Sequence, residues 1–372
     1  MITTINNKHK KLNVPNLRFP EFQGEWEKSK LSDLCTFFSG GTPSSSNKDF
    51  YGGDIAFIRS GELHADSTEL FITQDGYDNS SAKMVEIGDL LLAMYGATSG
   101  DISISKIKGA INQAILCIRT NQNKKFIESV WNKHVSKILR KYLQGGQGNL
   151  SADIVKGISF SFPTLEEQER IANLISLLDE RIATQNKIID KLQSLIKGIA
   201  QKIVHSNKTN VHLSECVECS SSTLQESDVC EHGAYPVYGA NGIVGYLDNY
   251  NTEDEAVYII KDGSGVGTVS YVTGKCSATG TLNTLQAKEG YSLQYLYYLL
   301  KVFNFEPYKT GMAIPHIYFK DYGKAKFFCP SYTEQLQYAQ SLSAIDSKLL
   351  VEKNILTSLS MQKKYLLRQM FI

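Results

Sequence analysis

Three cysteines and one histidine lie close together in the sequence, and their side chains are those that bind zinc. The set is Cys216, Cys219, Cys230 and His232, which offers four ligands for a tetrahedral metal site. The preceding segment, Leu213-Ser214-Glu215, is similar to Leu31-Ser32-Asp33, after which Cys35 is the only nearby cysteine. We expect no metal, because a duplicated scaffold that folds without zinc in one copy does not need it in the other. A zinc or thiol enzyme built on these residues is the alternative, and it would carry stoichiometric zinc.

Other patterns typical of catalysis are absent from the sequence. Gly274-Lys275-Cys276 lacks the upstream glycine spacing and the hydroxyl of a phosphate-binding P-loop. No long amphipathic helix is predicted after Gly263–Gly267, as a dinucleotide fingerprint requires. The Asp-Pro-Pro-Tyr sequence of adenine amino-methyltransferases does not occur, and none of the seven histidines stands in a paired metal motif or a Ser/His/Asp spacing. The sequence therefore predicts a protein that is not an enzyme and has no cofactor of its own.

Glycine-rich polar segments follow several apolar runs. At a constant offset of 167 residues along the sequence, Gly96 and Gly100 correspond to Gly263 and Gly267. Glycine beside Ser, Thr, Asn, Gln and Tyr lets a backbone approach a ligand closely while amides and hydroxyls reach phosphates and base edges. A single loop of this kind is also what simply connects two strands, but its recurrence in both halves favours a binding face. The segments are Ser39–Ser46, Tyr95–Gly100, Gln144–Asn149, Asp262–Gly267 and Thr310–His316.

A long helix that would position these loops is predicted over Pro163–Val204. Apolar residues recur there every seven residues on two heptad positions, with Gln185 as the one polar break, and this pattern requires a partner helix. Thr164-Leu165-Glu166-Glu167 has the form of a capping box. At about 1.5 Å per residue the helix would be roughly 60 Å long. The predicted seam residues are Ile171, Ile175, Leu178, Ile182, Ile189, Leu192, Ile196, Ile199 and Ile203.

The partner helix is predicted in the same chain. The shift that carries Gly96 to Gly263 also places Pro330–Phe371 over the first helix without a gap, and Ser331–Glu334 repeats the capping box. Glu352 falls at the polar break, and Lys363 is the one weakened seam position. A repeat this long indicates a duplicated two-part module, so we expect the helices to pack antiparallel within one molecule. The second seam comprises Tyr338, Leu342, Ile345, Leu349, Leu356, Leu359, Leu366 and Met370.

Short apolar runs bounded by glycine and polar turns precede each long helix and predict buried strands. Phe126–Leu143 and Leu293–Phe303 have helical spacing. We therefore predict an α+β fold, in which two similar α/β modules are separated by an intramolecular coiled coil of two antiparallel helices with a pseudo-two-fold repeat. The predicted parts are 1–163 (with the first dozen residues as a flexible arm), 164–205, 206–330 and 331–372. The strand runs are Asp54–Arg59, Asp89–Met94, Ala110–Ile118 and Ala256–Ile260.

The composition is that of a folded protein of the cytoplasm. A chain of 372 residues has room for two or three domains, and its 42% of hydrophobic and 21% of charged residues are ordinary. No apolar run is long enough to span a bilayer, and Met1–Lys11 is polar and basic, so neither membrane insertion nor secretion is predicted. The seven irregularly spaced cysteines suit a reducing cytosol. The net charge of +1 neither indicates nor excludes a nucleic-acid partner.

Three parts of the chain resemble the specificity subunit of type I restriction–modification systems. They are its opening segment (Asn13–Pro20, Gly24–Trp26 and Leu31–Leu34), its central conserved region (Gly148–Ser151 and Phe162–Ala172) and its distal conserved region (Pro330–Ile372). The resemblance covers nearly the whole chain after the first dozen residues. Ser331-Tyr332 and Leu336–Tyr338 depart from the family pattern at the start of the last helix.

The resemblance implies two target-recognition domains, each of which reads one half of a split sequence in double-stranded DNA, with the helix pair fixing the spacer. It implies two modification subunits that bring S-adenosylmethionine and adenine methylation. It also implies two restriction subunits that bring ATP, Mg²⁺, translocation and the nuclease. A coiled-coil scaffold that binds only protein is the alternative, and it would show no salt-dependent affinity for DNA.

We expect the polar loops to contact the DNA, with one set for each half-site. Arg59 is included because a guanidinium after a strand can pair bidentately with guanine; a surface arginine paired within the protein is an equal alternative. The candidates for the first half-site are Ser39, Gly40, Gly41, Thr42, Ser44, Arg59, Tyr95, Gly96, Thr98, Ser99, Gln144, Gln147 and Asn149. Those for the second are Tyr238, Asn241, Lys261, Gly263, Ser264, Lys309, Thr310 and His316.

Overall fold

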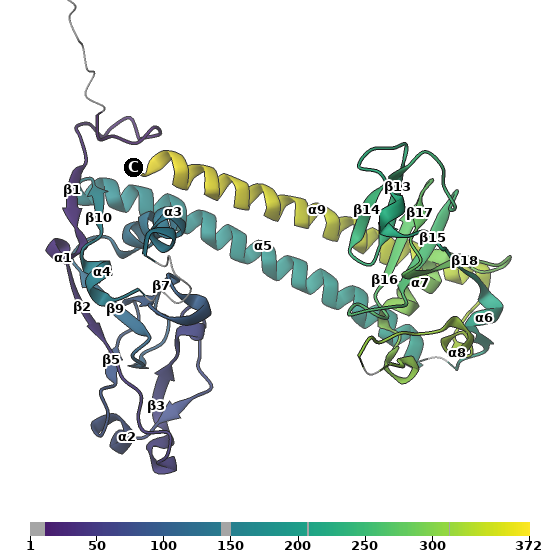
Figure 1. Ribbon diagram of the computed structural model, residues 1–372, viewed down its shortest axis with the longest axis horizontal. Coiled ribbons are helices and arrows are strands. Elements are labelled where there is room, and N and C mark those ends of the chain that lie inside the picture. Colours follow the sequence, from purple (N-terminus) through teal and green to yellow (C-terminus); the bar gives the residue numbers. More distant parts are fainter. Residues whose placement is uncertain (1–11, 143–149, 207, 312) are drawn as a thin grey trace, which may run out of the picture. The chain divides into compact units, whose positions relative to one another are not determined.

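The two long helices predicted from the heptad pattern are confirmed in this computed structural model (Figure 1). Helix α5 spans Leu165–Ser206 and helix α9 spans Tyr332–Met370. Ser331 and Glu334 form the predicted capping box at α9: the Glu334 carboxylate accepts from the Ser331 amide at 3.1 Å, and the Ser331 hydroxyl accepts from the Glu334 amide at 3.4 Å. Both helices therefore begin where the sequence signals indicate.

Only half of the predicted capping box forms at α5. The Thr164 hydroxyl accepts from the Glu167 amide at 3.4 Å, but the Glu167 carboxylate does not return to the Thr164 backbone. Instead it accepts two hydrogen bonds from the Arg18 guanidinium, at 2.8 and 2.7 Å, and one from the Trp26 indole at 3.3 Å. The reciprocal box predicted there is wrong, because a bidentate charged partner from the N-terminal segment binds the carboxylate more strongly than a backbone amide does.

The structure describes residues 12–142, 150–206, 208–311 and 313–372. The chain divides into two units: Met1–Thr184 with Leu356–Ile372, and Gln185–Ile355. The first unit is therefore assembled from two separate stretches of sequence, whereas the second is continuous. Each long helix contributes one part to each unit.

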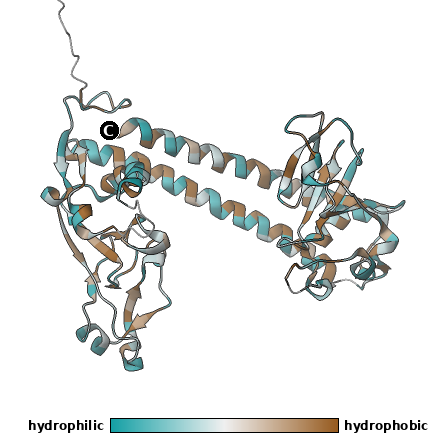
Figure 2. Cartoon of the chain, viewed as in Figure 1, coloured by the Kyte–Doolittle hydropathy of each residue, from teal (hydrophilic) through white to brown (hydrophobic). Residues whose placement is uncertain are grey.

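Within the first unit, α5 and α9 pack antiparallel. Ile171 and Ile175 share a buried core with Met370 and Phe371, while further along α5 the Asp179 carboxylate lies 2.5 Å from the Lys363 ammonium. Residue numbers thus rise along one helix as they fall along the other. The ion pair also explains why the lysine at the weakened seam position is tolerated. Both helices carry apolar and polar residues along their length (Figure 2).

Within the second unit, the polar break in each helix meets the other. The Gln185 amide donates to the Glu352 carbonyl at 3.0 Å and to its carboxylate, and both side chains are buried. Further along, Ile196 and Ala200 of α5 line one hollow with Asp346 and Leu349 of α9, so the packing is again antiparallel. Tyr338 is wrong as a seam residue, since it is 36% exposed and its ring lies tilted against that of Tyr295, with the centroids 6.0 Å apart. The other predicted seam residues are buried or half-buried.

The first module contains two small sheets. One is antiparallel in the order β2-β9-β6-β7, and the other has the order β4-β3-β8-β5 with β3 and β8 parallel. The predicted single strand Ala110–Ile118 is wrong, because Asn112 and Gln113 turn the chain between β8 and β9. The strands are β2 (Cys35–Ser39), β3 (Tyr51–Ile58), β4 (Phe71–Ile72), β5 (Lys83–Val85), β6 (Leu90–Ala93), β7 (Ile102–Ile104), β8 (Gly109–Ile111) and β9 (Ile115–Thr120).

Helix α3 (Lys124–Tyr142) packs on the antiparallel sheet of the first module, and the two share a large apolar core. Its Trp131 is fully buried, and the indole donates to the Gly100 carbonyl at 2.8 Å. A short pair, β1 (Glu27–Lys30) with β10 (Ser159–Phe162), brings the start of the module beside its end. The short helices of the module are α1 (Leu31–Leu34), α2 (Gln74–Asp78) and α4 (Ala152–Lys156).

The second module has the same plan. An antiparallel sheet β12-β18-β15-β16 is accompanied by a small sheet β14-β13-β17, in which β13 and β17 are parallel, and by helix α7 (Leu293–Val302). The strands are β11 (Val211–His212), β12 (Val217–Ser221), β13 (Tyr235–Gly239), β14 (Gly242–Leu247), β15 (Glu255–Ile260), β16 (Val269–Thr273), β17 (Ser277–Ala278), β18 (Leu282–Ala287) and β19 (Lys326–Phe327); the short helices are α6 (Leu213–Cys216) and α8 (Phe319–Tyr322). The α+β class with two similar modules is confirmed. Among the residues that the structure describes, no helix is both long and apolar enough to cross a membrane.

Candidate nucleic-acid interface

One loop has the same backbone conformation in both modules. In the first module it joins β6 to β7, and its amides bond in the pattern Gly100 to Ala93 and Ser99 to Gly96. The β15–β16 loop repeats these bonds at the predicted offset, from Gly267 to Ile260 and from Val266 to Gly263. Positive φ angles recur as well: 76° and 87° at Gly96 and Gly100, and 94° and 89° at Gly263 and Gly267. Since glycine adopts this left-handed region without a steric penalty, it fixes the loop shape in both modules.

In the first module, this loop lies beside two other polar segments. The Met94 amide donates to the Ala114 carbonyl, which belongs to the Asn112–Ala114 turn, and the Leu150 amide donates to the Met94 carbonyl. The Thr42 hydroxyl donates to the Gln113 side-chain carbonyl at 2.6 Å, which ties the predicted segment Ser39–Ser46 to the same turn. The structure thus brings the first two predicted loops together through a turn that sequence reasoning missed.

The second module joins its corresponding loops more directly. The Lys261 amide donates to the Thr281 carbonyl, and the Ile317 amide donates to the Lys261 carbonyl. These two bonds correspond, at the same offset, to those that Met94 forms in the first module. Asp262 pairs with His316 in an isolated β-bridge, and the Gly263 amide donates to the Pro315 carbonyl. The segments Lys261–Ser264 and Lys309–His316 are therefore adjacent where Asp262 and Gly263 meet Pro315 and His316, with Met312 outside the described residues.

A hollow of about 490 Å³ opens beside these loops in the second module. Lys261 and Lys320 bring positive charge to it, while Asp262 supplies an acceptor. Ser220 and Ser221 at the end of β12 also line it, and the sequence analysis missed them. Their signal was available, because Ser220-Ser221-Ser222-Thr223 is a polar run at the end of a strand, as Ser39 is the polar end of β2 in the first module.

Several predicted contact residues are held by their own module. The Arg59 guanidinium forms two bonds with Glu62, at 3.1 and 2.9 Å, which fits the alternative of an internally paired arginine. Ser99 donates to the Met94 carbonyl at 3.0 Å. Internal partners are also present at Ser44 (Ser46 hydroxyl, 2.7 Å), Lys309 (Glu306 carboxylate, 2.5 Å), Thr310 (His316 carbonyl, 3.3 Å) and His316 (Ile314 carbonyl, 3.3 Å), in addition to Thr42, while Tyr95 packs against the module core.

Other predicted residues remain open to a ligand. Asn241, at the β13–β14 turn, and Ser264, in the repeated loop, are exposed. Tyr238 in β13 corresponds to Ile58 in β3. Tyr238 pairs with Ala278 of the parallel strand β17, and Ile58 pairs with Ile111, the counterpart of Ala278 in the parallel strand β8. Arg59 and the segment after Tyr238 thus occupy equivalent positions in the two modules. The candidates Gln144, Gln147 and Asn149 lie outside the described residues.

These loops offer groups for hydrogen bonding. Backbone amides, hydroxyls, carboxamides and a few lysines gather at the ends of sheet strands, where they can contact phosphates and base edges. Within the described residues, no group of three or more His, Cys, Asp or Glu is arranged to hold a metal ion. Cys216 Sγ lies 3.8 Å from Cys329 Sγ instead, and burial raises the pKa of the Cys219 thiol to about 11, so it stays protonated at neutral pH.

The duplicated geometry has a counterpart in known proteins. A sequence model of the type I restriction modification DNA specificity domain matches residues 23–194 and, a second time, residues 206–361. The chain belongs to this specificity family. The two matches coincide with the two modules that share the repeated loop, and each extends into the long helix that follows its module.

Individual members of the specificity family are distantly similar to this chain. The MjaX putative specificity subunit of Methanocaldococcus jannaschii is 27% identical over 211 residues, which are 52% of this chain and 49% of that protein. The MjaIX specificity subunit of the same organism is 26% identical over 182 residues, 45% of this chain and 42% of that protein. The chain thus matches about half the length of these relatives. The crystal structure of a type I restriction–modification S subunit from M. genitalium shares the fold, with a TM-score of 0.69, 18% identity and coverage of 96% of this chain and 99% of the other.

Proposed function

We propose that this chain is the DNA-recognition subunit of a type I restriction–modification complex. Each module reads one half of a bipartite duplex target, and the helix pair keeps the half-sites at a fixed spacing. The observation that carries the proposal is the loop that recurs in both modules with the same main-chain bonds and positive-φ glycines. A polar surface that is preserved in shape, but not in side chains, suits two modules that read different sequences by the same means.

The chain itself carries out no reaction in this proposal. Two modification subunits supply S-adenosylmethionine and adenine methylation, and two restriction subunits supply ATP-driven, Mg²⁺-dependent translocation and cleavage in the cytoplasm. The relatives' names as specificity subunits of type I restriction enzymes support this division of labour. The long helices offer a docking surface, since Leu177 and Leu195 of α5 and Leu350 and Met361 of α9 are between 48% and 65% exposed.

Exchanging one module tests the proposal. Residues 206–330 are replaced by the corresponding module of a specificity-family relative, and the full chain is produced with its modification subunits. Sequencing of methylated genomic sites should then show a new second half-site and an unchanged first half-site and spacer. The matched control is the reciprocal exchange of residues 1–163, which should change only the first half-site. A complex that assembles but shows no salt-dependent DNA binding would support the scaffold alternative instead.

A further inference from the structure

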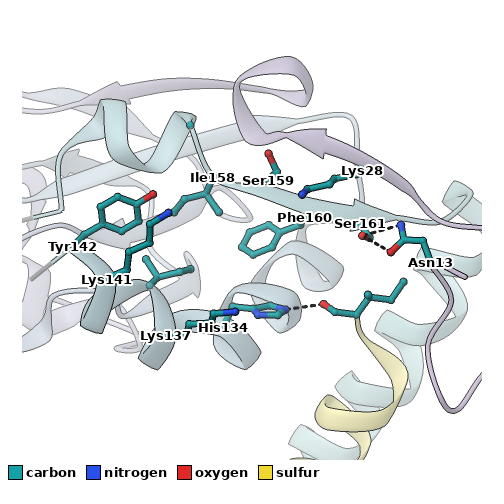
Figure 3. A pocket seen from close by; sticks show the side chains of 13 residues that line it. Asn13, Lys28, His134, Lys137, Lys141, Tyr142, Ile158, Ser159, Phe160 and Ser161 are labelled. Atoms are coloured by element: carbon teal, nitrogen blue, oxygen red, sulfur yellow. Dashed lines mark hydrogen bonds between the residues drawn. The ribbon is translucent and has the colours of Figure 1, made fainter. Parts of the chain in front are cut away.

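A hollow of about 560 Å³ in the first unit is lined by basic side chains (Figure 3). Lys137 and Lys141 project into it from the last turns of α3, and Lys28 projects from β1. His134 lies at one side, where its ring packs 5.6 Å from Phe160 and its Nε2 lies 2.8 Å from the Ile372 carbonyl oxygen. Ser159, Ser161 and Tyr142 add hydroxyl groups.

No carboxylate side chain balances this charge. The lining contains neither Asp nor Glu, and none of the three lysines forms an ion pair in the described part of the chain. The residues outside the described ranges contain no Asp or Glu either. Burial lowers the pKa of His134, and the positive charges of Lys133 and Lys137 lower it further. Three lysine ammonium groups with no Asp or Glu beside them therefore give the hollow an excess of positive charge, which favours an anion.

The dipole of helix α3, which favours basic residues at its C-terminal end, does not account for the basic residues that line the hollow. Basic residues in the last turn of a helix complement its dipole, and Arg140 and Lys141 occupy that turn in α3. Lys137 lies one turn earlier, and Lys28 comes from a strand near the other end of the module's sequence. The four basic groups converge through tertiary structure, so their convergence calls for a ligand outside the chain.

Helix α3 connects this hollow to the candidate nucleic-acid interface. The Trp131 indole binds the Gly100 carbonyl, and a Cβ at Gly100 would lie 2.9 Å from Val135 and 3.0 Å from Leu139. One face of α3 thus supports the repeated loop, while the neighbouring face, with Lys137 and Lys141, lines the hollow. After Tyr142 the chain enters the predicted contact segment 144–149.

The second module has no equivalent site among its described residues. Its helix α7 is only 10 residues long and ends with a single basic residue in its last turn, Lys301. That ammonium lies over the Tyr297 ring and 3.9 Å from the Asp346 carboxylate, so its charge is balanced. The basic hollow therefore belongs to one module of a molecule that otherwise repeats its parts, and its ligand must be bound asymmetrically.

We propose that the hollow lined by Lys28, Lys137 and Lys141 binds backbone phosphates of DNA beside the half-site read by the first module. This inference rests on the proposed function and adds a sequence-independent contact on one side of the target. Lysine serves as a point charge for phosphate, and contacts of this kind position a protein on DNA without selecting bases. An acidic segment of a partner protein is the competing occupant, but the continuity of α3 with the repeated loop favours DNA.

The test uses the full chain assembled with its modification subunits and a duplex that carries the methylated motif. Lys137→Gln with Lys141→Gln should leave the motif unchanged, because these side chains reach phosphates and not bases. The slope of log K against log salt concentration should fall by about 1.8, since each phosphate contact contributes about 0.9. Lys28→Gln alone should lower it by about 0.9. Phosphate-ethylation interference should disappear only beside the first half-site.

The matched control is Lys187→Gln with Lys191→Gln, which removes two lysines with the same spacing from the exposed surface of α5. Its slope should equal that of the wild type. An unchanged slope and interference pattern in the α3 variant would overturn the proposal while leaving the proposed function intact. Loss of assembly with the modification subunit, seen by size-exclusion chromatography, would overturn the proposal and assign the hollow to a partner protein instead. Failure of the wild-type complex to bind DNA would refute the proposed function itself.

Discussion

Gly40 is the residue at which a single methyl group should damage recognition most selectively. It follows the last residue of β2 and packs against the last residue of β8, where a Cβ would lie 1.7 Å from the Ile111 carbonyl oxygen. An ordinary contact needs about 3.4 Å, so the chains must separate by roughly 1.7 Å (3.4 minus 1.7). Ile111 is paired with both Ile58 and Lys83, so the displacement should fall on the segment after Gly40.

The consequence for binding can be estimated from that displacement. The bond between Thr42 and Gln113, now 2.6 Å, would exceed hydrogen-bonding distance, and the segment would leave its place beside the Asn112–Ala114 turn. Overpacking of this kind costs about 1–3 kcal/mol of folding stability. Removal of one base contact should cost about 1–3 kcal/mol of discrimination, or roughly 5- to 150-fold in affinity.

The assay compares Gly40→Ala with Gly61→Ala in the assembled complex. Gly61 lies in the same module, and a Cβ there would meet no atom within 4 Å. Dissociation constants are measured for the intact target and for duplexes altered in one half-site, and thermal unfolding is followed in parallel. Gly40→Ala should lose discrimination at the first half-site only, while Gly61→Ala behaves as wild type. Equal affinities and equal melting temperatures for the two variants would refute the reasoning.

Two further predictions concern the helix pair. Burial acts to raise the pKa of Asp179, but hydrogen bonds from Lys125 and Lys363 outweigh it and lower the pKa overall. The ionised Asp179 carboxylate therefore stabilises the fold above the unfolded pKa of about 3.9, and this stabilisation is lost as pH falls through the folded pKa. Asp179→Asn should unfold at lower urea than wild type at pH 7, with the gap closing below about pH 4, and a gap that persists at low pH would contradict this origin. A four-residue insertion after Gln185 should lengthen α5 by roughly 6 Å and the methylated motif's spacer by one or two pairs of about 3.4 Å, whereas two residues rotate the seam by about 200° and should destabilise the fold. Methylation that persists with an unchanged spacer after the four-residue insertion would show that the helices do not set the spacing.

Periodic features were predictable from the sequence because they depend on neighbouring residues. The heptads of α5 and α9 follow from helix geometry alone, and the repeated loop follows from glycines that recur at a constant offset. Tyr338 failed as a seam residue because the heptad pattern does not show that its ring contacts Tyr295 of α7. Local periodicity thus predicts which face of a helix is apolar, but not which part of the module meets it.

Contacts between distant segments were not predictable in this way. Glu167 has a capping-box sequence, yet its partner Arg18 lies 149 residues earlier. Asn112 and Gln113 stand within an apolar run that reads as one strand, and only the pairing of β8 with β3 and of β9 with β6 shows that the chain turns there. The basic hollow combines β1, α3 and β10, so no single stretch of sequence carries its signal.

The discontinuous first unit has a consequence for how the protein is made. Met370 and Phe371 belong to the same buried core as Trp26 and Phe126, and the Leu17 amide bonds to the Gln369 carbonyl. In a nascent chain, the core of the first module therefore stays incomplete until Met370 and Phe371 have been translated. This is unusual, because domains synthesised first ordinarily fold first. Gln185–Ile355 is one continuous stretch, so all of its residues have been translated before Leu356–Ile372. The module translated second can thus close first, and during that interval the unfinished core of the first is the surface that a chaperone or protease would meet.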